Sequence, residues 1–454
     1  MQWDIQNKME KNLTQGSIFK NIVQFSFPFL LSYFLQTLYG MADLFIAGQF
    51  NGAEVISAVS IGSQVMHMFT VMIVGLAMGS GVLIGQAVGA RDSKKTANVI
   101  GNTIIVFLFL SVILTVLLFI LVKPIVNAVS TPSESIEQTV DYLRICFLGI
   151  PFIIAYNLVA SVYRGMGNSK SPMIFVAIAC VINIILDFIF MGVFGMKASG
   201  AAFATVIAQA ISVIISFFAM FKGKNGLKLK KDDFKINKNI VTDVLKIGLP
   251  VACQDGFIQI SFLVITTIAN RRGVEVAAAV GIVEKIITFL FLIPSSMLST
   301  ISAISAQNIG AGKKERAVKT LFEGTAIALG IGMIFAGIFQ FISYPVLKTF
   351  TKDTEVIKLG VQYLRTYVID CVFASVHFCF SGYFVALGKS LISFVHNCIS
   401  IIFFRIPGAY LAAKVWPETL TPMGLAAPIG SLVSALICVF AFFVIENRAK
   451  KSSL

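Results

Sequence analysis

The chain has 454 residues, of which 57% are hydrophobic and only 13% charged, and its formal net charge is +14. A soluble domain carries about 25% charged residues, so this composition excludes an ordinary water-soluble protein and indicates one that is solvated by lipid. The positive charge lies in short loops between apolar runs, which is typical of membrane topology. We therefore expect the lipid bilayer as a partner and no nucleic acid.

Twelve apolar segments follow one another along the chain, each long enough for the roughly 20 residues that a bilayer-spanning helix needs. They are 18–43, 55–88, 97–122, 140–162, 171–192, 200–221, 243–270, 276–306, 317–343, 359–382, 390–413 and 424–446. With the N-terminus inside, the inner loops hold about three times as many Lys and Arg residues as the outer loops. This predicts an all-α, multi-pass protein of the cell (inner) membrane with both termini in the cytoplasm.

The sequence matches itself at an offset of 221 residues. Gln86-x-x-Gly89-Ala90 matches Gln307-x-x-Gly310-Ala311, and the run Tyr142-Leu143-Arg144 matches Tyr363-Leu364-Arg365. A constant offset over more than a hundred residues indicates a duplication. We predict a six-helix lobe at 1–221, a basic cytoplasmic linker at 222–242 and a second six-helix lobe at 243–454. Because six is even, the lobes are parallel repeats, an arrangement typical of transporters that work by alternating access.

The first span contains a carboxylate in an apolar setting. Asp43 lies in a run without Lys or Arg between Lys20 and Arg91, and Gln36 and Tyr39 precede it at spacings that share one helical face. An acidic residue inside the bilayer is costly and is by default a functional candidate. The other interpretation is a partly hydrated cap near the outer helix end. We favour a cavity-facing acid, with Gln36 and Tyr39 as candidate substrate contacts.

A second carboxylate, Asp187, follows Asn183 by one turn in the fifth span, and Thr205 lies in the sixth. If these faces meet Asp43, the oxygens suit a hard cation such as Na+. Two close carboxylates could equally share a proton. Asp43, Asn183, Asp187 and Thr205 are thus the candidate coupling site for Na+ or H+. Asn157 in the fourth span is a candidate substrate contact or an interhelical hydrogen bond.

These motifs together resemble the MATE (multidrug and toxic compound extrusion) family. The resemblance covers nearly the whole chain and depends on Pro28 with Gln36-x-x-Tyr39-x-x-x-Asp43, the Gln-x-x-Gly-Ala loop, Arg164-Gly165-x-Gly167 and Asn183-x-x-x-Asp187. It implies two six-helix lobes in a V and export of organic, often cationic, compounds driven by Na+ or H+. On this basis we expect a monomeric secondary antiporter that uses no cofactor beyond its coupling ion.

The second half does not repeat the acids of the first. At the same offset Asp43 corresponds to Val264 and Asp187 to Gly408, so ion coupling is assigned to the N-terminal lobe. The C-terminal lobe has its own acids, Asp255 and Asp370, which could attract a cationic substrate or form a second ion site. Glu284, Lys285 and Arg405 lie in or near spans, where we expect them to neutralise one another or to reach the interface.

Three other functions fit the sequence less well. A membrane-embedded enzyme is disfavoured because His67, His377 and His396 have no metal-ligand spacing and no nucleophile elbow or phosphate loop is present. A channel would not need a two-lobe repeat with buried acids. A flippase for lipid-linked oligosaccharides would be expected to line its cavity with several Arg or Lys residues, and the spans contain very few.

Overall fold

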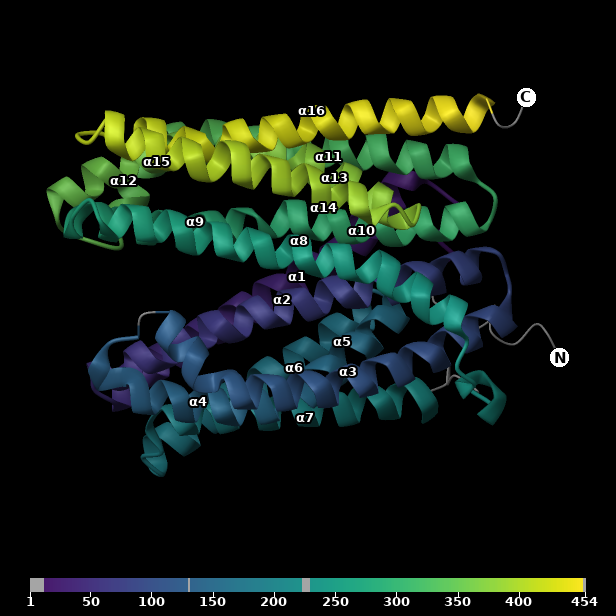
Figure 1. Ribbon diagram of the computed structural model, residues 1–454, viewed down its shortest axis with the longest axis horizontal. Coiled ribbons are helices and arrows are strands. Elements are labelled where there is room, and N and C mark those ends of the chain that lie inside the picture. The colour runs from purple at the N-terminus through teal and green to yellow at the C-terminus, as the bar shows by residue number, and fades with distance from the viewer. Residues whose placement is uncertain (1–11, 130, 223–228, 452–454) are drawn as a thin grey trace. The chain divides into compact units, whose positions relative to one another are not determined.

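The computed structural model describes residues 12–129, 131–222 and 229–451, and these residues are helical apart from short turns and loops (Figure 1). They fall into two compact units. The first holds residues 27–252 with short pieces at 12–14 and 310–312, and the second holds residues 15–26, 253–309 and 313–451. The lobes predicted at 1–221 and 243–454 and the linker predicted at 222–242 were defined by the sequence duplication. These boundaries remain a prediction.

The helices that lie wholly or mostly in the first unit run side by side (Figure 1), although residues 18–26 of the first of them belong to the second unit. They are α1 (Ile18–Phe50), α2 (Ala53–Gly89), α3 (Ser93–Ala128), α4 (Ile136–Leu148), α5 (Ile150–Gly165), α6 (Lys170–Asp187), the π-helix η3 (Phe188–Val193) and α7 (Lys197–Lys222). Short 3-10 turns η2 (Ser133–Ser135) and η4 (Lys231–Phe234) precede α4 and α8 (Lys238–Asn270). α8 begins inside the predicted linker, whose residue Lys235 accepts a hydrogen bond from Asn102 of α3 through its carbonyl oxygen.

The second unit repeats this order, beginning with residues 253–270 of α8. It contains α9 (Val274–Leu290), α10 (Leu292–Gly310), α11 (Lys314–Lys348), α12 (Thr354–Tyr367), α13 (Asp370–Ala386), α14 (Ser390–Ser400), the π-helix η5 (Ile401–Arg405), α15 (Ile406–Val415) and α16 (Thr421–Lys451). Gly310, the last residue of α10, belongs by its contacts to the first unit.

Eleven helical segments of the described chain are long and apolar enough to cross a membrane, and the count is twelve when α4 and α5, bent by 47°, form one span. The predicted spans are therefore confirmed. The bend was not predicted. It lies at Gly149, just before Pro151 in the first turn of α5, where a proline cannot donate the hydrogen bond that would continue α4.

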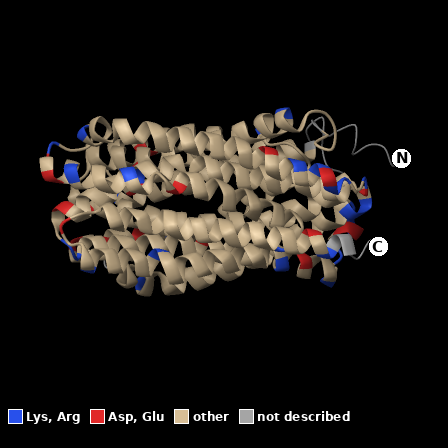
Figure 2. Ribbon diagram, turned by 90° about the horizontal axis from the view of Figure 1, so that it is seen from above, with Lys and Arg blue, Asp and Glu red and all other residues tan. Residues whose placement is uncertain are grey.

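Large apolar side chains cover the outer faces of the helices. On α3, Leu108, Phe109 and Ile120 are each about two-thirds exposed. Charged residues lie mostly at helix ends and in loops, with few along the helix middles (Figure 2). A surface of this kind is stable only against hydrocarbon, so the protein is a multi-pass membrane protein.

One cluster in the second unit is polar where its counterpart in the first unit is apolar. Tyr156, Ala160, Phe175, Val176 and Val213 form an apolar cluster in the first unit. The residues 221 positions later are His377, Ser381, His396, Asn397 and Ser434. His396 contacts the hydroxyl groups of Ser381 and Ser434 at 2.9 and 3.2 Å, and thereby joins α13, α14 and α16.

This correspondence predicts how the cluster tolerates substitution. His396→Phe should lower the free energy of unfolding by about 1–3 kcal/mol, because the buried Ser381 hydroxyl group loses its partner and Ser434 keeps only its hydrogen bond to the backbone carbonyl oxygen of residue 396. Adding Ser381→Ala and Ser434→Val, which gives these three positions the residues of the first unit, should restore most of that loss. Thermal unfolding of the purified variants in one detergent measures both. Equal stability of the single and triple variants would contradict the explanation.

Candidate functional site

A cavity of about 130 Å³ lies within the first unit, among α1, α2, α4, α5, α6 and α7. Its lining is mostly polar and aromatic, and includes Gln36, Tyr39, Asp43, Ser63, Met66, His67, Thr70, Tyr142, Tyr156, Asn157, Cys180, Asn183, Thr205, Gln209 and Ser212. The lining contains a single carboxylate, Asp43, and no Lys or Arg. The cavity therefore offers a negative site to a ligand and no fixed positive charge.

The face predicted on α1 does turn toward this cavity. Gln36, Tyr39 and Asp43 all line it, because residues spaced four and three apart lie above one another on a helix. Asp43 is only 2% exposed, while Gln36 and Tyr39 are half-buried. Asp43 is thus not the hydrated cap that the other interpretation described.

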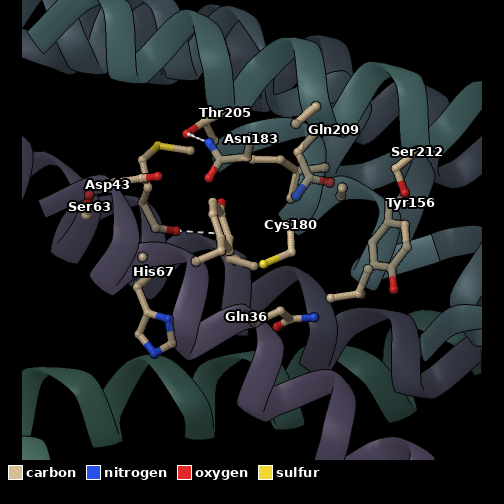
Figure 3. A pocket seen from close by; sticks show the side chains of 18 of the residues that line it. Gln36, Asp43, Ser63, His67, Tyr156, Cys180, Asn183, Thr205, Gln209 and Ser212 are labelled. Carbon is tan, nitrogen blue, oxygen red and sulfur yellow. Dashed lines mark hydrogen bonds between the residues drawn. The ribbon is translucent and has the colours of Figure 1, made fainter. Parts of the chain in front are cut away.

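The groups predicted to accompany Asp43 meet it at one end of the cavity. Asp187, Asn183 and Thr205 surround its carboxyl group. The Asn183 amide lies 3.5 Å from the Thr205 hydroxyl group, with Asp43 beside them (Figure 3). Asp187 is fully buried behind the cavity wall and does not line it. It is the last residue of α6, where the helix widens into the π-helix η3, an irregularity frequent at functional sites.

This group of oxygens is incompletely satisfied. Both carboxylate oxygens of Asp187, Oδ1 of Asp43 and Oδ1 of Asn183 are buried and have no hydrogen-bond partner among the described residues. Buried charges are stable only when they are paired or bind a cation. The arrangement can hold one hard monovalent cation among carboxylate, amide and hydroxyl oxygens, or a proton shared by the two carboxyl groups.

Asn157 also lines the cavity. Its amide nitrogen donates a hydrogen bond to the carbonyl oxygen of Ile153, one turn earlier on the same helix, at 2.9 Å. This bond lies within α5, so it is not the interhelical hydrogen bond that was predicted from the sequence as the alternative.

Several cavity residues were not predicted from the sequence. Gln209 and Ser212 follow Thr205 on α7, and the spacing of four between Thr205 and Gln209 was a signal that could have identified Gln209. Tyr142, whose hydroxyl group lies 3.1 Å from that of Ser63, belongs to the repeated run Tyr142-Leu143-Arg144, which we interpreted only as a sign of duplication. His67 faces the cavity from α2 and is labelled in Figure 3.

The acids predicted in the C-terminal half lie elsewhere. Asp255 is half-buried on α8, and Asp370 is fully buried as the first residue of α13. Arg405 is an electrostatic neighbour of both Asp370 and Glu284, whereas Lys285 is exposed. The structure therefore does not bring Asp370 to the cavity of the first unit.

Comparison with known proteins identifies the family. The MatE family model matches residues 28–189 and again 250–411, so each match begins on a proline inside the first long helix of a repeat. "Probable multidrug resistance protein YpnP" of Bacillus subtilis is 27% identical over 87% of the chain and 88% of that relative. "Multidrug export protein MepA" of Staphylococcus haemolyticus is 24% identical over 96% and 95%.

A solved structure described as "Crystal structure of MATE in complex with MaL6" has the same fold. It superposes with a TM-score of 0.90, at 21% identity, over 99% of both chains. The repeated helical order, the cavity with its buried acids and the double match to the family model agree with one another. The chain belongs to the MatE family and is a multi-pass membrane transporter, not an enzyme.

Proposed function

We propose that this transporter exports small organic cations in exchange for Na+ or H+. The observation that carries the proposal is the buried pair Asp43 and Asp187, whose unpartnered oxygens lie beside a cavity that no Lys or Arg lines. Related proteins named for multidrug resistance and multidrug export support drug-like substrates.

The coupling ion is assigned to the group Asp43, Asp187, Asn183 and Thr205. A driving ion shifts the equilibrium between inward- and outward-open states only when it binds them differently. Asp43 faces the cavity and Asp187 lies behind it, so closing or opening the cavity changes the water available to one carboxylate more than to the other. This is the differential contact that coupling requires.

The cavity suits a lipophilic cation better than a phosphorylated lipid. Tyr39, Tyr142 and Tyr156 offer ring faces, Met66 offers an adaptable apolar contact, and Asp43 offers charge. Pyrophosphate recognition would need several Arg or Lys residues, and none lines the cavity. Gln36, Tyr39 and Asn157 are the proposed substrate contacts, and Asp255 is proposed to attract cationic substrates from its place on α8.

Proteoliposomes loaded with a fluorescent lipophilic cation provide the test. An imposed Na+ gradient or an imposed pH gradient, each at zero membrane potential, should drive the dye against its own gradient. The gradient that succeeds identifies the ion. Accumulation of an anionic dye but not of the cation would contradict the proposed substrate class, and indifference to both gradients would contradict antiport.

A further inference from the structure

Arg405 is the only Lys or Arg side chain that is buried among the residues the structure describes, with 8% of its surface exposed. It ends the π-helix η5, and its Nη2 donates a hydrogen bond to the hydroxyl oxygen of Tyr367. Its guanidinium carbon lies 4.6 Å from the ring centre of Phe262, a cation–π distance. A buried guanidinium persists in a membrane helix only when negative charge compensates it.

Two carboxylates lie near enough to Arg405 to interact with its charge, although neither is in direct ion-pair contact with it among the described residues. Asp370 on α13 and Glu284 on α9 are both electrostatic partners of Arg405. Asp370 is fully buried, and neither of its oxygens makes a hydrogen bond of ordinary geometry among the described residues, although the Ser431 hydroxyl group lies beside them. Glu284 accepts one hydrogen bond, from Thr266 at 3.0 Å, and its other oxygen has none. The remaining titratable groups around Arg405 are Tyr363, Tyr367 and His377.

The two units therefore differ in how the charge of their buried carboxylates can be compensated. In the first unit the acid pair Asp43 and Asp187 has no Lys or Arg beside it in the cavity lining, where His67 is the one basic side chain. The residue 221 positions before Arg405 is Ile184, one turn before Asp187 on α6. The acid pair Glu284 and Asp370 of the second unit thus has a covalently attached cation near it, whereas the acid pair Asp43 and Asp187 of the first unit has no such Lys or Arg.

We propose that Arg405 is a tethered counter-ion that takes the place of an exchangeable cation at Glu284 and Asp370. Because a covalently attached cation cannot leave, the second unit contributes no ion to the transport cycle. Exchange is then confined to Asp43 and Asp187, a consequence that depends on the function proposed above. Asp370, predicted from the sequence as a substrate contact, becomes a partner of Arg405.

Thermal unfolding of the purified full-length protein tests this. All variants carry Asp43→Asn, so that the first unit lacks the carboxylate that faces its cavity. Each is heated at about pH 7.5 in sodium chloride or in choline chloride at equal ionic strength, and again at about pH 5.5. The variants are Arg405→Met, which removes the charge, Arg405→Lys, which keeps it, and Arg405→Met with Glu284→Gln and Asp370→Asn.

The melting temperature of Arg405→Met should be lower than that of its parent in choline. It should rise by about 5 °C or more with Na+ or at the lower pH, because Na+ or protons can now bind Glu284 and Asp370, which have lost their counter-ion. Arg405→Lys and the triple variant should respond to cations no more than the parent does. If Arg405→Met does not fold but the triple variant does, charge compensation is also supported. Arg405→Met that responds like its parent, or a triple variant that does not fold, would overturn the proposal.

Discussion

Asp43→Asn and Asp187→Asn are each expected to abolish export of every substrate at normal membrane levels. Asparagine keeps the shape and much of the hydrogen bonding of aspartate but removes the charge that holds a cation. Both carboxylates are buried, at 2% and 0% exposure, so no water compensates the loss. We expect gradient-driven transport in proteoliposomes to fall by at least about a hundredfold, equivalent to about 2.8 kcal/mol.

The control for this prediction is Asp255→Asn, a change to an acid that is half-buried on α8. Its carboxylate is proposed to attract cations without holding the coupling ion, so at least one substrate should still be exported. If Asp43→Asn keeps transport with the same ion dependence as the parent, the coupling site lies outside the group around Asp43.

A fixed positive charge placed in the cavity is expected to inactivate the transporter as completely as the loss of Asp43 or Asp187. Cys180 lines the cavity on α6 and lies within electrostatic reach of Asp43. In Cys180→Arg the guanidinium should compensate Asp43 permanently, and the coupling ion could no longer exchange. Export of cationic substrates should fall by about a hundredfold or more, because a like charge also repels the substrate.

Cys180→Leu separates charge from size, since leucine fills the cavity without a charge. It should reduce export several-fold at most and leave the ion dependence unchanged. Export is to be measured in the same proteoliposomes, at matched protein content. Equal inactivation by leucine and arginine would show that the cavity is blocked by volume rather than by charge.

Much of the fold follows from composition and periodicity. The predicted span 97–122 lies inside α3, and the predicted span 171–192 matches α6 with η3 to within one residue at each end. Membrane helices are predictable because the bilayer forces each backbone polar group into a helix. The breaks within spans were not predicted, because a bend at Gly149 or a π-helix after Asp187 depends on how neighbouring helices pack.

The site was partly predictable for a similar reason. Helical spacing placed Gln36, Tyr39 and Asp43 on one face, and the structure turns that face to the cavity. Spacing along one helix cannot show which helices meet, so the proximity of Asp43 to Asp187 required the fold. The electrostatic proximity of Arg405 and Asp370 likewise relates residues from two helices that the sequence does not connect.

Substrate-driven ion movement tests the central claim most directly. If export is obligatorily coupled, a substrate gradient must move the ion in the opposite direction, because coupling between two ligands is reciprocal. Vesicles with no ion gradient and no membrane potential receive a gradient of a transported cation, and the movement of Na+ and H+ is recorded. We predict opposite movement of one ion by the parent protein and none by Asp43→Asn. Substrate movement without ion movement in the parent, or an unchanged ion flux in Asp43→Asn, would contradict the account.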